Sequence, residues 1–199
     1  MTSAQSMYNI ESLWPEAVVI YPQGLPSPPP EDPSGALKPG WQTVPGQSGD
    51  RDLKLFDAIL ARMSGKYHVD PKQVYSVGFS GSAIMTYVLW SQRHAKLAAG
   101  AIAEGRLLDA NKPLQPMAAF VAAGKNDTTC SFQDQVQYIR YDRTVDGVAP
   151  NATPTVQAGV RYFHGSNADL AVLIFNGGHQ YAPGMSQKVV PFFKTHKQP

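Results

Sequence analysis

Residues 73–85 read QVYSVGFSGSAIM, and this stretch decides the fold of the chain. A β-branched and aromatic run meets a turn of small residues around Ser80, and a helical pattern then begins. A sharp strand–turn–helix of this kind lifts a serine hydroxyl out of the backbone, as a serine nucleophile requires. Gly78 and Gly81 tolerate the strained dihedral angles of such a turn. The usual pattern is G-x-S-x-G, and Ser82 stands at its last position.

An acid and a histidine follow predicted strands further along the chain. The small apolar run 117–124 predicts a buried strand that leads into Asp127, and the run 170–175 predicts another that leads through two glycines to His179. Serine, acid and histidine in this chain order, each after a successive strand, are typical of a hydrolase triad. The three placements agree, which favours a shared site at one edge of a sheet.

Each candidate also has a simpler interpretation or a rival. Ser80 could serve as a helix N-cap, and Asp127 could cap a helix or stabilise a turn. Glu104 is the rival acid, since it also follows a predicted strand. His164 is the main rival of His179. The remaining histidines lie near helix ends or in a terminal helix: His68, His94 and His196.

The same segments carry a family resemblance. The chain resembles the secreted esterases grouped with polyhydroxybutyrate depolymerases and feruloyl esterases, within the α/β-hydrolase superfamily. The resemblance implies that Ser80 is the nucleophile, that His179 is the general base and then acid, and that Asp127 orients the histidine. It also implies a secreted or periplasmic protein. The matching segments are 18–25, 52–82, 123–127, 177–179 and 183–184.

Two departures from the family pattern affect the expected site. Ser82 replaces a glycine at which helix and strand pack closely. The oxyanion hole of the superfamily uses the backbone N–H after the nucleophile, here that of Gly81, and a second N–H from a loop after an earlier strand. Only residues 1–16 precede the first predicted strand, so we expect the N-terminal strands of the family to be missing. A sheet edge would then be exposed, and a homodimer through that edge is expected.

Composition fits one catalytic domain over residues 1–199. The net charge of +2 offers no basic stripe for nucleic acid, and no apolar run is long enough to span a membrane. No signal peptide is visible in this sequence. Cys130 is the single cysteine, so an internal disulfide is impossible. No cluster has metal-ligand spacing and no glycine loop cradles a phosphate, so neither metal nor cofactor is expected.

The pattern of elements predicts an α/β fold, a mainly parallel sheet flanked by helices, with the site at the carboxyl ends of the strands. A long loop rich in proline, glycine and serine is expected over residues 22–50. The other predicted elements are strands at 18–21, 98–103 and 155–163, helices at 51–67, 82–94, 132–143 and 187–196, and a loop at 146–154.

The expected chemistry is ester hydrolysis through a covalent serine ester. The resemblance implies two kinds of substrate, feruloyl or acetyl esters of plant polysaccharide and hydroxyalkanoate esters. Either kind could be polymeric. Trp41, Phe79 and Tyr181 are candidate substrate-binding residues, although Trp41 could equally pin its loop to the core and Tyr181 could pack in it. The alternatives are a weak or inactive hydrolase-like binding module, and a peptidase or acyltransferase with the same triad.

Overall fold

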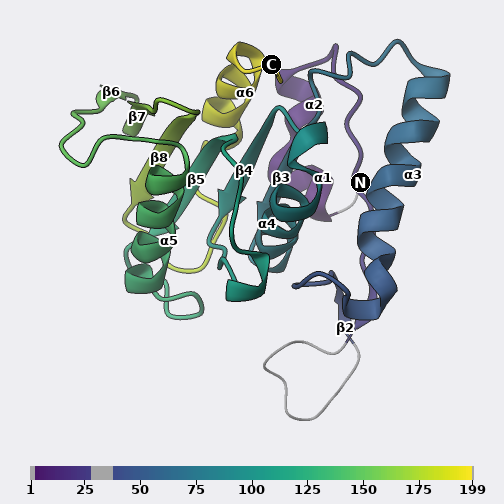
Figure 1. The fold of residues 1–199 in the computed structure, drawn as a ribbon, viewed down its shortest axis with the longest axis horizontal. Helices are drawn as coiled ribbons and strands as arrows, with labels where there is room; N and C mark the ends of the chain where they lie inside the picture. Colours follow the sequence, from purple (N-terminus) through teal and green to yellow (C-terminus); the bar gives the residue numbers. More distant parts are fainter. Residues whose placement is uncertain (1–2, 28–37, 199) are drawn as a thin grey trace.

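The computed structural model describes residues 3–27 and 38–198 of the chain. Its centre is a six-stranded sheet in the order β3-β4-β5-β8-β7-β6, with helices on both faces (Figure 1). Strands β3, β4, β5 and β8 run parallel, whereas β7 and β6 run antiparallel at one edge. The mainly parallel α/β architecture is confirmed. The strands are β3 (Tyr75–Phe79), β4 (Ala99–Ala103), β5 (Ala118–Gly124), β6 (Thr155–Gln157), β7 (Val160–His164) and β8 (Asp169–Phe175).

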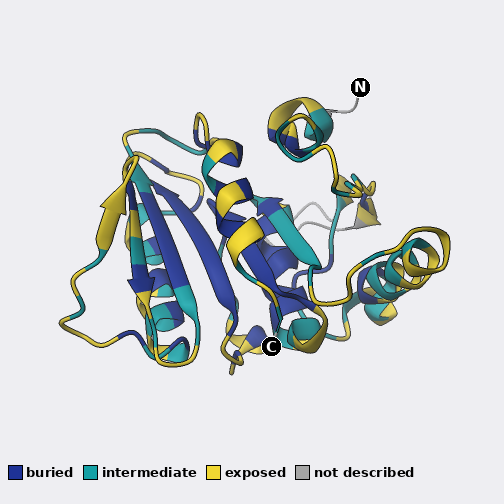
Figure 2. Cartoon of the chain, turned by 90° about the horizontal axis from the view of Figure 1, so that it is seen from above, coloured by how far each residue is buried: buried dark blue, intermediate teal, exposed yellow. Residues whose placement is uncertain are grey.

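The central strands are buried at every position, because helices cover both faces of the sheet (Figure 2). Alternate side chains of a strand point to opposite faces, so β4 and β5 each need apolar residues at consecutive positions. Their sequences, AGAIA and AAFVAAG, meet this need with small residues. Ile102 and Val121 contribute to one core layer, whereas Ala101 and Phe120 contribute to the other.

One face of the sheet packs against α4 (Gly81–Arg93) and α5 (Phe132–Val145), and the other packs against α6 (Ser186–Thr195). Helix α3 (Arg51–Lys66) lies outside α4, and Asp57 of α3 pairs with Arg93 at the end of α4. Helix α4 is buried continuously from Ala83 to Trp90, as is typical of a helix that is apolar on all sides. These four helices confirm the predicted ones to within two residues at each end. No helix in the described residues is long and apolar enough to cross a membrane. Short 3₁₀ turns are η1 (Gln47–Asp50), η2 (His94–Lys96) and η3 (Asp109–Asn111).

The N-terminal region differs from its prediction. It forms two short helices that were not predicted, α1 (Ser3–Tyr8) and α2 (Ile10–Leu13). The predicted strand at 18–21 is wrong: this segment is irregular, and Val18 and Ile20 are 48% and 40% exposed. A strand needs a neighbour for its N–H and C=O groups, and none pairs with this segment among the described residues. Its other residues, Val19 and Tyr21, pack against a small cluster around Tyr8.

Two other predictions need correction. The predicted strand at 155–163 is a hairpin, because Ala158 and Gly159 have φ angles of 49° and 80° and turn the chain between β6 and β7. Two central residues with positive φ are typical of a tight hairpin turn. The segment 22–50 also holds a short antiparallel ladder, β1 (Leu25–Ser27) with β2 (Lys38–Gly40). Residues 28–37, predicted as part of that loop, lie outside the described residues.

Candidate active site

Ser80 lies in a strained turn between β3 and α4. Its φ and ψ angles are 56° and −121°, a conformation that residues with a side chain rarely adopt. The turn is held on one side because the Ser80 N–H donates to the Ala103 carbonyl at 2.9 Å. Close packing explains Gly78, since a Cβ there would lie 2.1 Å from the Ser82 carbonyl oxygen. The sharp turn predicted for residues 73–85 is therefore present.

Ser82 fits in place of the usual glycine because its side chain points along the strand edge. Its hydroxyl accepts a hydrogen bond from the Phe79 N–H at 3.0 Å and lies 2.7 Å from the Phe79 carbonyl oxygen, to which it can donate. The Tyr8 hydroxyl lies 3.3 Å from Ser82 Oγ. The hydroxymethyl group therefore adds contacts to the turn rather than opening it.

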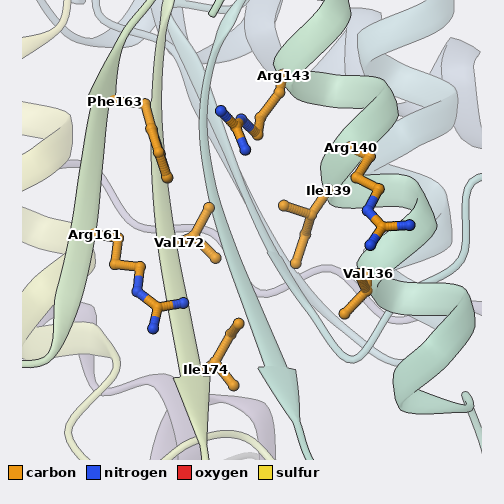
Figure 3. A pocket seen from close by; sticks show the side chains of 8 residues that line it. All are labelled: Val136, Ile139, Arg140, Arg143, Arg161, Phe163, Val172 and Ile174. Carbon is orange, nitrogen blue, oxygen red and sulfur yellow. The ribbon is translucent and has the colours of Figure 1, made fainter. Parts of the chain in front are cut away.

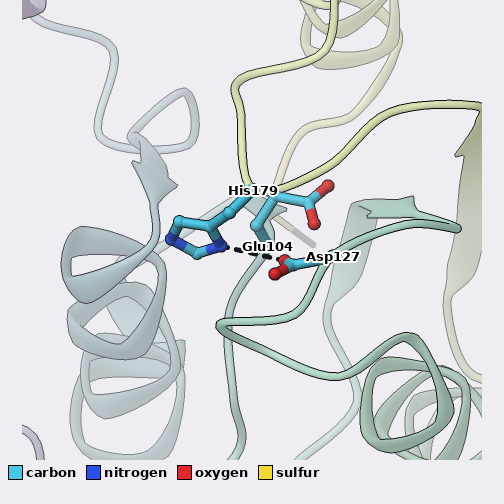
Figure 4. Close-up of side chains that lie close together, drawn as sticks. All are labelled: Glu104, Asp127 and His179. Atoms are coloured by element: carbon cyan, nitrogen blue, oxygen red, sulfur yellow. Dashed lines mark hydrogen bonds and ion pairs between the residues drawn. The ribbon is translucent and has the colours of Figure 1, made fainter.

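His179 joins the serine to an acid. Its Nε2 lies 2.8 Å from Ser80 Oγ. Its Nδ1 lies 2.9 Å from Asp127 Oδ2 on the other side of the ring (Figure 4). The tautomer with its proton on Nδ1 donates to the carboxylate and leaves Nε2 to accept the serine proton. The Asp127 side chain is fully buried and that of His179 is 21% exposed, so the imidazole lies between the interior and solvent.

Backbone contacts bring the two loops together. Lys125 and Asn126 donate their N–H groups to the carbonyls of Phe175 and Gly177 at 3.0 and 2.9 Å. A Cβ on Gly124 would lie 2.7 Å from the Gly177 carbonyl oxygen, so only glycine allows this approach. The end of β5 is thereby attached to the loop that carries the histidine.

Asp127 is surrounded by hydrogen-bond donors. Its Oδ1 accepts from the N–H groups of Thr129 and Cys130 at 2.8 and 2.9 Å, and its Oδ2 accepts from Gln135 Nε2 at 3.0 Å. Burial alone would raise the pKa of Asp127, but the hydrogen bonds from Glu104, His179 and these N–H groups outweigh it and lower the pKa to about 2. The acid is therefore charged at neutral pH.

Glu104, the rival acid, lies beside Asp127 rather than in another part of the molecule. It is 1% exposed, and burial together with its hydrogen bond to Asp127 raises its pKa to about 8. Ligand atoms of Glu104, Asp127 and His179 lie within 4.8 Å of one another, a spacing that a cation could bridge. Both imidazole nitrogens already bond to Ser80 and Asp127, so this cluster is better suited to hydrogen bonding than to metal binding.

The predicted oxyanion donor begins helix α4. Gly81 is exposed and is the first helical residue, a position at which the N–H has no partner within the helix. Its N–H is therefore free of the helix ladder, next to the serine. Its role at an oxyanion stays a prediction.

The three candidate substrate residues lie in different surroundings. The ring of Phe79 is 5.1 Å from that of His179 and 6.5 Å from that of Tyr181. Tyr181 lines a groove of about 280 Å³ between α1 and residues 181–187, where Tyr8 also lies. Trp41 packs against the core cluster that contains Leu53, a placement that favours pinning of its loop. Substrate contact by any of the three stays a prediction.

His164, the rival histidine, ends β7, which lies near the opposite edge of the sheet from β3. Its side chain is 78% exposed, and its Nδ1 bonds to Asp169 Oδ1 at 3.0 Å. A small apolar hollow of about 140 Å³ lies nearby, between α5 and the β7–β8 pair, and includes none of the candidate site residues (Figure 3).

Sequence reasoning missed two residues around the candidate site, Gln135 and Tyr8. Gln135 is 2% exposed and faces the acid from the first turn of α5. A glutamine in an amphipathic helix gives no sequence signal of this role. Tyr8 belongs to a helix that was not predicted.

Comparison with known proteins places this geometry in context. No protein-family model matches the chain. The chain is 29% identical over 124 residues to a bifunctional acetylxylan esterase/xylanase of Neocallimastix patriciarum, a match that covers 62% of this chain and 16% of that protein. It is 24% identical over 197 residues to a probable feruloyl esterase C of Aspergillus niger, covering 95% of this chain and 67% of that protein.

Solved structures share the fold at low sequence identity. An acetyl xylan esterase from Aspergillus awamori superposes with a TM-score of 0.60 at 16% identity, over 83% of this chain and 74% of that chain. A Bacillus cereus carboxylesterase gives a TM-score of 0.56 at 18% identity, over 78% and 68% of the two chains. The sheet order and these solved structures show that the chain has the fold of these esterases, a mainly parallel sheet flanked by helices. Its sequence is similar to those of a feruloyl esterase and an acetylxylan esterase.

Proposed function

We propose that the chain hydrolyses carboxylic esters, with Ser80 as nucleophile, His179 as general base and acid, and Asp127 as the orienting acid. One observation carries the proposal: a continuous hydrogen-bonded series runs from Ser80 Oγ through both nitrogens of His179 to Asp127. This is the connectivity that activates a serine hydroxyl for acyl transfer. The similarity to esterases supports the same reaction class.

The reaction proceeds in two halves. His179 Nε2 takes the hydroxyl proton as Ser80 Oγ bonds to the ester carbonyl carbon, and Asp127 stabilises the imidazolium. The intermediate collapses, the bond to the alcohol oxygen breaks, and His179 gives its proton to the departing alcohol. Water then repeats the sequence: His179 takes its proton, the oxygen attacks the acyl carbon, and the acid leaves as Ser80 regains its proton.

The negative oxygen of each intermediate needs hydrogen-bond donors. In this proposal the Gly81 N–H is one, since it lies at the free N-terminus of α4, whose dipole also favours negative charge. The similarity to an acetylxylan esterase and a feruloyl esterase favours feruloyl and acetyl esters of plant polysaccharide as substrates over hydroxyalkanoate esters. A secreted protein would meet such polymers, and assaying the culture medium of the source cells tests this location.

The proposed function is tested by hydrolysis of p-nitrophenyl acetate and of methyl ferulate, with labelling by a fluorophosphonate probe. Turnover and labelling are expected for the wild type and should vanish in Ser80→Ala. Asp127→Asn should lower kcat by about 10³- to 10⁴-fold, because the amide favours the wrong imidazole tautomer.

Ser64→Ala is the matched control, because Ser64 is exposed on α3, and it should behave as the wild type. A folded wild-type protein with neither turnover nor labelling would contradict the proposal. That result would favour a non-catalytic binding module.

A further inference from the structure

Strand β4 ends in an acid that the proposed reaction does not use. Glu104 follows Ala103, and its N–H donates to the Ala122 carbonyl at 3.2 Å. Its φ angle is 51°, in the left-handed region that is unusual for a residue with a side chain. Such a conformation persists only where the surrounding structure enforces it. The turn keeps the carboxyl group inside the protein, close to Asp127 and His179 (Figure 4).

Glu104 and Asp127 share one donor and also contact each other. Gln135 Nε2 lies 3.0 Å from Glu104 Oε2 and 3.0 Å from Asp127 Oδ2, so the amide bridges the two side chains. A carboxylate oxygen of Glu104 lies within 4.8 Å of one of Asp127. Two negative charges this close in a buried site repel each other, so the neutral form of one acid is favoured.

The surroundings place that proton on Glu104. Asp127 receives two backbone N–H bonds and faces His179, all of which favour its charged form. Glu104 Oε1, by contrast, is buried without a hydrogen-bond partner among the described residues. Burial favours the neutral form of Glu104 and outweighs the hydrogen bonds from Gln135 and the Gly124 backbone, which favour its charged form. The other titratable or charged groups close to this pair are the Cys130 thiol, which bonds to the Gly105 carbonyl, and Arg106.

We propose that Glu104 is a positioning residue of the candidate triad, a neutral carboxylic acid that donates a hydrogen bond to Asp127 and holds its carboxylate against His179. This inference rests on the proposed function for its kinetic consequences. No covalent step involves Glu104. Its effect is to supply Asp127 with a donor that water cannot replace, since both acids are buried.

The arrangement predicts a loss of activity at alkaline pH. Burial and the bond to Asp127 raise the pKa of Glu104 to about 8. Above that pH Glu104 becomes charged, its proton no longer joins the two acids, and the two carboxylates repel each other. Asp127 is then held less well against His179. Since the two acids interact strongly, the inflection in the pH profile of activity reports the titration of the pair rather than of Glu104 alone.

Two substitutions separate this role from simple packing. The amide of Glu104→Gln can still donate to Asp127 but does not titrate, whereas Glu104→Ala removes the donor. We expect kcat of E104Q to exceed that of E104A by about tenfold at pH 7, the effect of one lost hydrogen bond. Between pH 7 and 10, kcat should decline in the wild type and stay level in E104Q. Glu16→Gln, at an exposed position, is the matched control and should keep the wild-type profile.

An alkaline decline in E104Q equal to that of the wild type would overturn the inference, as would equal kcat values for E104Q and E104A. Circular dichroism at each pH checks that the variants remain folded. A second measurement does not depend on turnover. The carboxyl groups of the Ser80→Ala protein are titrated by ¹³C NMR, and the Glu104 signal is assigned as the one that disappears when E104Q is added to this variant.

A midpoint near 8 for that signal is expected. A midpoint near the ordinary value of about 4.3 would overturn the inference even in an active enzyme. The two proposals fail separately: a protein without turnover whose Glu104 titrates near 8 would contradict ester hydrolysis and leave the hydrogen-bonded pair intact.

Discussion

Ser82 carries a hydroxyl group where the serine-turn pattern usually has only hydrogen. That hydroxyl contacts both the N–H and the C=O of Phe79, the residue just before the candidate nucleophile. These backbone groups point away from β4, because Ser80 N–H and Val74 C=O make the bonds to that strand and alternate residues face opposite edges. The side chain therefore replaces the partner that a neighbouring strand would provide.

Replacing Ser82 tests this role at the residue scale. Ser82→Ala should lower the free energy of unfolding by about 1–3 kcal/mol, because half-buried backbone groups of Phe79 lose their partner. It should also lower kcat, since the turn that orients Ser80 loosens. Tyr8→Phe removes only the weaker contact at 3.3 Å and should cost less. Urea unfolding measures both, and a Ser82→Ala protein as stable as Ser64→Ala would contradict this role.

At the scale of elements, β3 occupies the edge of the sheet. Within the described residues it pairs only with β4, although it carries the candidate nucleophile at its carboxyl end. At the outer edge, the N–H and C=O groups of Phe79 bond to the Ser82 hydroxyl. The backbone groups of Tyr75 and Val77 also face outward, because alternate residues of a strand face the same edge. Unpaired edge groups invite a strand from another chain.

A homodimer through the edge of β3 therefore remains our prediction. We expect sedimentation equilibrium to give twice the mass of 21.6 kDa. The amide of Val77 should be protected from hydrogen exchange, and that protection should weaken on dilution as the dimer dissociates. A monomer at all concentrations, with a rapidly exchanging Val77 amide, would show that this edge has no strand partner.

At the scale of the whole molecule, buried acids make stability depend on pH. Asp142 and Asp146 lie on and just after α5, are fully buried, and have pKa values that burial raises to about 7 and about 8. In the folded protein they keep their protons at a pH where the unfolded chain has lost them. The unfolded state therefore binds fewer protons, and stability falls as pH rises from about 4 toward 8.

We expect the melting temperature to fall between pH 5 and pH 8 and the fall to be smaller in Asp146→Asn. The amide keeps an oxygen for the Met117 N–H, which Asp146 Oδ1 accepts at 3.2 Å, but does not titrate. Asp109→Asn, whose side chain is 96% exposed, is the control and should keep the wild-type slope. Calorimetry at several pH values measures this, and equal slopes for all three proteins would contradict the prediction.

The local sequence was sufficient to predict the strands and helices that carry a regular apolar pattern. The apolar runs of β4, β5 and β8 are buried on both faces, and the helices α3 to α6 carry their own periodicity, so both could be predicted. The strand at 18–21 was predicted wrongly because pairing depends on a neighbour, which a local pattern does not report. The hairpin at Ala158–Gly159 was missed because this pair is a weak turn signal.

The sequence by itself determined the α/β class, the strained turn at Ser80 and the chain order of serine, acid and histidine, since each depends on neighbouring residues. Only the tertiary structure decided that Asp127 rather than Glu104 bonds to the imidazole of His179, and that His179 rather than His164 faces Ser80. It also decided that Glu104 lies beside Asp127 and that Ser82 bonds to the backbone of Phe79 at the edge of β3. Most of these contacts join residues far apart in the chain, and the contact of Ser82 with Phe79 depends on the sharp turn between them. Their distances follow from how strands and loops pack, which no local pattern of residues encodes.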